Sequence, residues 1–326
     1  MIGRIGLYEG VSHDPHYNLA VEQFLLESVE EGQCILYLWQ NQNTVVIGRN
    51  QNPWKECRTT LLREEGGILA RRLSGGGAVF HDLGNLNFTF LVPQADYDLN
   101  RQLSVIREAL RTLGIPAEIS GRNDILANGR KFSGNAFYKN GKQAYHHGTL
   151  LVDVDMEKLG RYLSPSKAKL RAKGVDSVRS RVVNLKELNP EITIDALKAA
   201  LREAFAQIYG CSVDMIGEPD LDRDRIAALT ERNRSWDWNF GQKLPFSFEC
   251  EDRFPWGGVQ VQLTVEAGII LQARIYSDAM DGHLIPHWEE QLTGCRLEQQ
   301  TLEAALNRRQ IPQEQDLLQL LLRHLT

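Results

Sequence analysis

The sequence predicts an α+β protein with two hydrophobic cores, and three observations support this fold class. Segments with the periodicity of amphipathic helices alternate with short apolar runs of strand length. The chain has 326 residues, which is long for one core. A turn-rich stretch at 236–245 separates two sets of such elements. We therefore expect a large domain over 1–243 and a small C-terminal α+β domain over 244–326.

The first elements are a helix and several strands. Asp14 can cap the amide groups at the start of a helix and Pro15 suits its first turn, so a helix is predicted over about 15–30. Two apolar runs at 34–39 and 44–48 flank a polar turn, which indicates a hairpin of two buried strands. Further strands are predicted at 68–72, 77–82 and 86–92.

A helix and a meander of strands follow. Leucine and isoleucine recur at helical spacing over 99–113, and Gly114 suits a left-handed stop because it has no Cβ. Asn-Gly pairs at 128–129 and 140–141 accept the positive φ that type I′ turns require. We therefore expect successive tight hairpins between about 123 and 154.

The remaining elements complete the two domains. The periodicity predicts helices at 156–163, 165–173 and 193–209, the last of which ends at Gly210. In the small domain, the pattern predicts strands at 246–253, 258–265 and 269–277, followed by two or three helices to Thr326.

The composition excludes several classes of protein. The net charge of −5 and the 24% of charged residues argue against general affinity for nucleic acid. The apolar runs are too short for a signal peptide or a membrane span, so we expect a cytoplasmic protein with no membrane partner. The five cysteines are widely spread without metal-site spacing, so we interpret them as buried free thiols.

One glycine-rich stretch contains residues suited to binding an anionic ligand. Three consecutive glycines, Gly75, Gly76 and Gly77, leave their amide groups unshielded, and Arg72 and the later Lys131 add positive charge. This pattern suits a site that binds a phosphate ester. The chain has neither a P-loop nor a G-x-G-x-x-G motif, so another fold must hold any nucleotide. A glycine triplet also serves a tight bend or bulge, and that alternative remains open at this stage.

Several ordered motifs resemble lipoate-protein ligase A. They are NPWKEC at 52–57, RRLSGGGAVFHDLGN at 71–85, GRND at 121–124, KFSG at 131–134, HHGTLL at 146–151, AKGVDSVRSRV at 172–182, WDWNFG at 236–241 and WGGV at 256–259. The resemblance therefore covers nearly the whole chain. It implies a mixed sheet flanked by helices, related to the catalytic domain of biotin-protein ligase, with a small accessory domain. It also implies ATP-dependent ligation of lipoate to a carrier lysine through lipoyl-AMP, with release of pyrophosphate and then AMP.

The resemblance also assigns residues to roles. Lys131 is the catalytic residue, bridging the lipoate carboxyl group and the α-phosphate, and Arg72 binds phosphate. The expected ATP and adenylate contacts are Arg72, Gly77, Ala78, Val79, Phe80, Asn123, Asp124 and Lys131. The expected lipoate contacts are Arg72, Ser74, Gly75, Gly76, Lys131 and His147. Asp124 is the candidate ligand for Mg²⁺, although aspartate also commonly caps a strand or turn.

Three histidines lie near these motifs. His146 and His147 must point to opposite faces if they share a strand, so at most one of them can face a pocket. For these two and for His81, a structural role is the simpler interpretation, and no supporting metal ligands are at suitable spacing. The basic residues between 167 and 181 could cover the adenylate or steer an acidic carrier domain, but their spacing equally fits a solvated helix face.

The implied partners are the apo lipoyl domains of 2-oxoacid dehydrogenase E2 subunits and the glycine cleavage H protein, and we expect the ligase to act as a monomer. One alternative is an ATP-independent octanoyl- or lipoyltransferase that uses a cysteine thioester. No cysteine occurs between Cys57 and Cys211, which opposes it. A non-catalytic lipoate-binding protein is the other alternative, which the retention of Lys131 opposes. Biotin is disfavoured because the Gly-Arg-Gly-Arg loop of biotin ligases is absent.

Overall fold

The computed structural model describes residues 2–120, 124–163, 182–240, 248–306 and 311–324. The chain divides into two compact units, each built from several segments. The first unit comprises Met1–Val46, Trp54–Arg71 and Ala78–Asn239. The second unit comprises Ile47–Pro53, Arg72–Gly77 and Phe240–Thr326.

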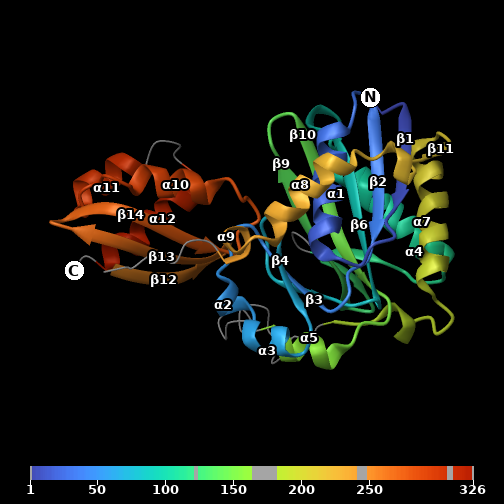
Figure 1. The fold of residues 1–326 in the computed structure, drawn as a ribbon, viewed down its shortest axis with the longest axis horizontal. Coiled ribbons are helices and arrows are strands. Elements are labelled where there is room, and N and C mark those ends of the chain that lie inside the picture. Colours follow the sequence, from blue (N-terminus) through green and yellow to red (C-terminus); the bar gives the residue numbers. More distant parts are fainter. Residues whose placement is uncertain (1, 121–123, 164–181, 241–247, 307–310, 325–326) are drawn as a thin grey trace. The chain divides into compact units, whose positions relative to one another are not determined.

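An eight-stranded mixed sheet forms the centre of the first unit (Figure 1). Its spatial order is β11-β1-β2-β6-β10-β9-β8-β7. Strand β1 is parallel to both of its neighbours, and the remaining pairs are antiparallel. The strands are β1 (Arg4–Glu9), β2 (Gln33–Trp39), β6 (Asn85–Pro93), β7 (Glu118–Ser120), β8 (Asp124–Ala127), β9 (Arg130–Lys139), β10 (Gln143–Leu151) and β11 (Val213–Met215).

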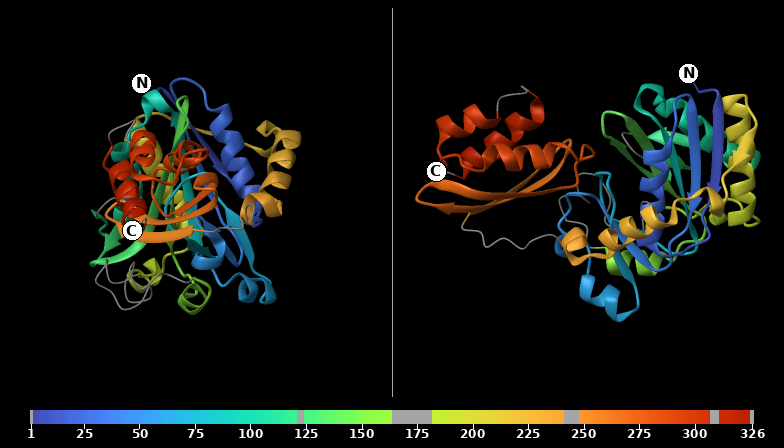
Figure 2. Two further views of the ribbon diagram at one scale, coloured as in Figure 1. Left: turned by 90° about the vertical axis from the view of Figure 1, so that its left-hand side faces the viewer. Right: turned by 45° about the horizontal axis from the view of Figure 1, so that its top comes forward.

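Helices cover both faces of this sheet (Figures 1 and 2). Helices α4 (Leu99–Thr112) and α7 (Ile194–Tyr209) pack on one face, where they bury a large apolar core with alternate residues of β2 and β6. Helix α1 (Pro15–Ser28) lies on the other face and packs against α8 (Arg223–Arg234). The face beneath α1 carries polar side chains, and it includes part of the candidate site.

The helix termini follow the sequence signals. The Asp14 carboxylate accepts a hydrogen bond from the His16 amide at the start of α1, with Pro15 in the first turn. Gly114, just after α4, has φ of 73°, and Gly210 ends α7 with φ of 70°. Because left-handed backbone strains residues with a Cβ, glycine suits both positions. These predictions are confirmed.

The predicted hairpin of 34–39 and 44–48 is wrong. Strand β2 pairs with β1 and β6, whereas β3 (Thr44–Ile47) belongs to a separate sheet of order β4-β3-β5 with β4 (Ile68–Arg71) and β5 (Val79–His81). Both hydrogen-bonding edges of β2 are already occupied, so no edge remains for β3. The apolar pattern predicts strands, but it does not say which strands pair.

The two predicted Asn-Gly hairpins differ in their turns. Between β8 and β9, Asn128 and Gly129 have φ of 50° and 74°, as a type I′ turn requires. The loop between β9 and β10 is longer, and only Gly141 in it has positive φ, at 90°. The side chain of Asn140 instead accepts hydrogen bonds from the amides of Lys142 and Gln143. The second hairpin is therefore confirmed, but its type I′ turn is not.

Short helices and 3₁₀ turns connect these strands. They are α2 (Pro53–Glu56), α3 (Thr59–Glu64), η1 (Gln94–Asp96), α5 (Met156–Tyr162), η3 (Leu185–Glu187), η4 (Glu218–Asp220) and α9 (Trp236–Phe240). The helix predicted at 165–173 lies outside the described residues. Helices α2, α3, α8 and α9 are absent from the predictions made above.

The second unit is a three-stranded antiparallel sheet backed by three helices (Figure 2). Its elements are β12 (Phe248–Phe254), β13 (Gly257–Glu266), β14 (Ile269–Ser277), α10 (Leu284–Leu292), α11 (Gln299–Leu306) and α12 (Pro312–Arg323). Two segments from early in the chain also belong here. The Ser277 amide donates to the Asn50 carbonyl at 2.8 Å, and the Gly76 amide donates to the Ala279 carbonyl at 3.0 Å.

Candidate active site

The first unit places Lys131 and Asp124 together on neighbouring strands. The Lys131 ammonium lies 2.8 Å from the Asp124 carboxylate, and both side chains are largely buried, with 17% and 16% of their surfaces exposed. Lys131 is near the start of β9 and Asp124 begins β8. The hairpin between the two strands thus joins a cation and a carboxylate from separate sequence motifs.

A β-bulge sets the direction of the Lys131 side chain. Across the β8–β9 pair, Ser133 stands opposite Ile125 and Lys131 stands opposite Leu126, so the intervening Phe132 is an extra residue in β9. The Phe132 ring is fully buried in the main core, which fixes the bulge. A bulge of this kind redirects neighbouring side chains, and bulges are frequent beside active sites.

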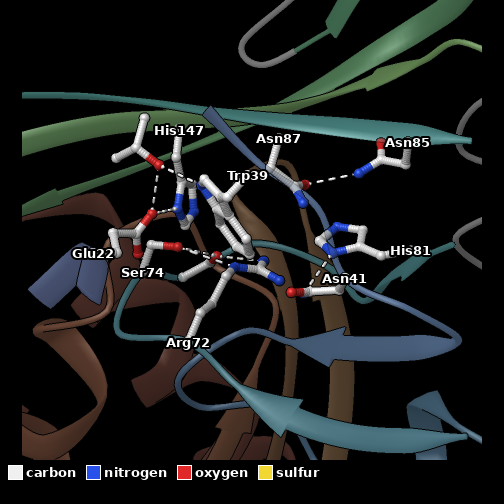
Figure 3. A network of polar contacts seen from close by, with 11 residues as sticks. Glu22, Trp39, Asn41, Arg72, Ser74, His81, Asn85, Asn87 and His147 are labelled. Atoms are coloured by element: carbon white, nitrogen blue, oxygen red, sulfur yellow. Dashed lines mark hydrogen bonds and ion pairs between the residues drawn. The ribbon is translucent and has the colours of Figure 1, made fainter. Parts of the chain in front are cut away.

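The glycine-rich loop is held by its own arginine. The Arg72 guanidinium donates to the Ser74 hydroxyl at 3.0 Å (Figure 3). It also donates to the carbonyls of Gly75 at 2.7 Å and Gly77 at 2.8 Å. Arg72 is 5% exposed. The buried guanidinium therefore stabilises the bend of the loop by charge-assisted hydrogen bonds, a role that the sequence reading did not anticipate.

The first two positions of the triplet require glycine for different structural reasons. A Cβ on Gly75 would lie 2.2 Å from the Ala279 carbonyl oxygen, so this position needs glycine for a close approach of two backbones. Gly76 has φ of 86°, which strains other residues. The Gly76 amide is bonded to the Ala279 carbonyl within the second unit. The triplet thus serves as a packed bend, in agreement with the alternative left open above.

The residues after the triplet enter strand β5. Phe80 is buried and packs against Tyr162, with 5.5 Å between the ring centroids. In the backbone ladder, Phe80 is opposite Val45 and Val79 is opposite Val46. Ala78 precedes the strand. The side chain of Phe80 therefore belongs to the core, and any nucleotide contact from this segment would come through its backbone.

The two adjacent histidines of β10 point to opposite faces of the large sheet, as predicted. His146 is fully buried among aromatic rings that include Phe88 and Phe90, and its Nε2 lies 2.8 Å from the Asn135 side-chain oxygen. Burial lowers the pKa of His146 to about 3, so this imidazole is neutral at physiological pH. It serves the core.

His147 belongs to a buried polar network on the face beneath α1 (Figure 3). The Glu22 carboxylate of α1 lies 2.7 Å from His147 Nδ1 and accepts a hydrogen bond from the Thr89 hydroxyl at 2.7 Å. The Trp39 indole N–H donates to the same hydroxyl at 3.1 Å. The network joins three strands and a helix around one carboxylate.

Two asparagines extend this polar face. Asn85 donates to Asn87 at 2.8 Å, and both are almost fully buried (Figure 3). Within the described part of the chain, Asn85 Oδ1 and Asn87 Nδ2 have no hydrogen-bond partner. Nearby on β5, His81 is buried and its Nδ1 lies 3.1 Å from the Asn41 amide nitrogen. Buried polar atoms without protein partners indicate a place for a ligand or water.

The sequence reading missed this row of polar residues. The residues that were not predicted are Glu22, Trp39, Asn41, Asn85, Asn87 and Thr89. A signal was present in β6, where Asn85, Asn87 and Thr89 alternate with apolar residues. This alternation normally indicates a strand with one solvated face, yet here every residue from 85 to 92 is buried. A central strand with alternating polar residues thus marks a buried polar surface.

Some predicted residues cannot be placed. Asn123 and the basic residues at 167–181 lie outside the described residues. Among the residues that are described, no group of three or more His, Cys, Asp and Glu side chains could hold a metal ion. None of the described helices is both long enough and apolar enough to span a membrane.

Two family models together match most of the chain. The model of the lipoyl protein ligase A/B catalytic domain matches residues 14–206, and that of the bacterial lipoate protein ligase C-terminus matches residues 243–321. Together with the mixed sheet and its helices, they define the protein as a ligase that acts on proteins. More particularly, the chain belongs to the lipoate-protein ligase family, whose members are enzymes.

Solved structures of this family share the fold. The P. falciparum LipL1 structure in complex with lipoate is 30% identical, with a TM-score of 0.83 over 93% of this chain and 94% of that chain. Lipoate-protein ligase A bound with ATP is 27% identical, with a TM-score of 0.63 over 74% and 99%. A Thermoplasma acidophilum bipartite lipoate protein ligase, studied with its E2 lipoyl domain, is 28% identical, with a TM-score of 0.64 over 76% and 100%.

Proposed function

We propose that this protein ligates lipoate to a lysine of a lipoyl carrier domain in two steps. In the first step, a lipoate carboxylate oxygen attacks the α-phosphorus of ATP, pyrophosphate leaves, and lipoyl-AMP forms. In the second step, the carrier amine attacks the acyl carbon, the acyl–phosphate bond breaks, and AMP leaves. Related ligases have been solved in complex with lipoate, bound with ATP, and together with an E2 lipoyl domain, and these structures support the same substrate classes here.

The pairing of Lys131 with Asp124 carries this proposal. An ammonium group that is mostly buried stabilises phosphoryl oxygens more strongly than one in water, because the surrounding protein screens charge less. The Asp124 carboxylate lies 2.8 Å from the ammonium and fixes the direction of the lysine side chain. We assign Lys131 the bridge between the lipoate carboxyl group and the α-phosphate.

The other assigned residues support the same chemistry. We propose that Arg72 contacts phosphate while it holds the loop, and that Ser74, Gly75 and Gly76 contact lipoate. Adenylate contacts are proposed from the backbone of Gly77, Ala78, Val79 and Phe80, and from Asn123. We also propose that His147, fixed by Glu22, contacts lipoate.

Asp124 is the proposed ligand for Mg²⁺. Its single carboxylate fits an ion that usually takes most of its ligands from phosphate oxygens and water. Such an ion would neutralise part of the triphosphate charge.

Pyrophosphate release measures the first step directly. We expect release that depends on both lipoate and ATP, followed by a lipoyl mass gain on an apo lipoyl domain of an E2 subunit or of H protein. Lys131→Ala is expected to lower pyrophosphate release on the order of a hundredfold or more, because it removes a cation from the transition state. Lys142→Ala removes an exposed lysine from the β9–β10 loop and is the matched control. Unchanged release in Lys131→Ala would discard the assigned role.

The same assay separates the two alternatives. Acyl transfer without ATP would indicate a thioester mechanism, whereas lipoate binding without pyrophosphate release would indicate a binding protein. The first alternative requires a reactive thiol. Burial raises the pKa of both Cys34 and Cys57 to about 12, so these thiols are protonated and unreactive at neutral pH.

A further inference from the structure

The Lys131 ammonium occupies space that a side chain at Gly134 would fill. A Cβ built on Gly134 would lie 2.7 Å from Lys131 Nζ and 3.0 Å from Lys131 Cε. Residues three apart in a regular strand point to opposite faces, so Lys131 and Gly134 would not normally meet. The extra residue Phe132 places them on the same side of β9. The bulge and the glycine together create the place in which the ammonium lies.

The backbone of Gly134 is itself fixed. The β9–β10 ladder ends at the pair of Asn135 and Gly148, and the Thr149 hydroxyl accepts the Gly134 amide hydrogen at 3.1 Å. In the β8–β9 pair, Gly134 stands directly opposite Asp124, which contacts the ammonium. Gly134 is thus held from both sides, by Thr149 and by strand β8.

We propose that Gly134 is a positioning residue that sets the location of the Lys131 ammonium, and that Thr149 fixes Gly134 for this purpose. The inference rests on the proposed role of Lys131 in adenylation. An ordinary contact begins at 3.4 Å, so a methyl group at Gly134 would push the ammonium by about 0.7 Å away from its place beside Asp124. A displacement of about 1 Å can lower the rate of a catalysed step about 100-fold.

The variant Gly134→Ala tests this inference. The nearest atom to the added methyl group is the flexible end of a side chain, so we expect the fold and thermal stability to be retained. We expect kcat for lipoate-dependent pyrophosphate release to fall about 100-fold. Gly160→Ala is the matched control, because a Cβ at Gly160 in α5 meets nothing within 4 Å. Wild-type kcat in Gly134→Ala would overturn the inference.

A double variant distinguishes positioning from general damage. If Gly134 acts through Lys131, adding Gly134→Ala to Lys131→Ala should change the residual rate by less than about twofold, because coupled residues are not additive. If Gly134→Ala lowered kcat in the double variant by the same factor as it does in the wild-type protein, the inference would be overturned. A wild-type rate in Lys131→Ala would discard the role proposed for Lys131. A reduced rate in Lys131→Ala together with a wild-type rate in Gly134→Ala would overturn only the positioning inference, so the two failures are distinguishable.

Thr149 gives a second, independent measurement. Thr149→Val removes the hydroxyl that accepts the Gly134 amide hydrogen, whereas Thr149→Ser keeps it. We expect kcat to fall in Thr149→Val and to remain near the wild-type value in Thr149→Ser. Equal rates in these two variants would contradict the part assigned to Thr149.

Discussion

Gly75→Ala tests whether the glycine-rich loop is a packed structural bend. The added Cβ would lie 2.2 Å from the Ala279 carbonyl oxygen and 2.6 Å from the Met280 carbonyl oxygen, both backbone atoms. An ordinary contact begins at 3.4 Å, so the two segments must separate by about 1.2 Å. The neighbouring bond from the Gly76 amide to the Ala279 carbonyl, now 3.0 Å long, would then be lost.

The structure gives the size of this effect. Overpacking of a filled interior costs about 1–3 kcal/mol. Loss of one intramolecular hydrogen bond adds about 1 kcal/mol. We therefore expect Gly75→Ala to lower the free energy of unfolding of the second unit by about 2–4 kcal/mol. Gly3→Ala is the control, because a Cβ at Gly3 meets no atom within 4 Å.

Hydrogen exchange followed by mass spectrometry is the appropriate assay. A protein of two compact units need not unfold in a single transition, and exchange reports on each segment separately. We expect faster exchange in Gly75→Ala over residues 72–77 and 277–282, with little change in the β8–β9 hairpin. A stability within about 0.5 kcal/mol of the Gly3→Ala control would refute the packing argument.

Two further predictions concern buried polar groups on the face of the large sheet that α4 and α7 cover. Gln102 of α4 is fully buried, and neither atom of its amide has a hydrogen-bond partner among the described residues. Gln102→Met should therefore raise the free energy of unfolding by about 1–3 kcal/mol in urea denaturation, and a lower value would show that the amide is bonded in solution. Burial lowers the pKa of His146 to about 3 from its ordinary value of 6.5, so unfolding takes up a proton between these pH values and stability falls as the pH falls through this window. The slope should approach about 1.4 kcal/mol per pH unit from this residue and should be reduced in His146→Gln, and equal slopes in the two proteins would contradict the assignment.

The sequence predicts elements well where the signal is local. The caps at Asp14 and Gly210 and the turn at 128–129 each depend on neighbouring residues, and the structure has them where expected. Strand pairing depends on distant residues. Strand β2 pairs with β1 and β6, whereas β3 pairs with β5. The predicted pairing of β2 with β3 is therefore wrong, although both strands exist.

In the candidate site too, local motifs could be predicted from the sequence, whereas contacts between distant residues could not. The motif containing Lys131 was found directly, but its pairing with Asp124 depends on a bulge that no periodicity indicates. The network of Glu22, Thr89 and His147 joins residues far apart in the chain, so only the fold brings it together. Arg72 was predicted to contact phosphate, whereas its hydrogen bonds to the carbonyls of its own loop depend on the folded bend and have no local sequence signal.

The second unit is assembled from three stretches of chain, which limits how this ligase can be divided experimentally. A fragment of residues 240–326 would lack the segments 47–53 and 72–77 that belong to the same compact unit. Its Ser277 amide and Ala279 carbonyl would lose the partners that Asn50 and Gly76 now provide. A single cut near residue 240 would therefore leave both products with broken backbone pairings, and studies of the small unit require the intact polypeptide.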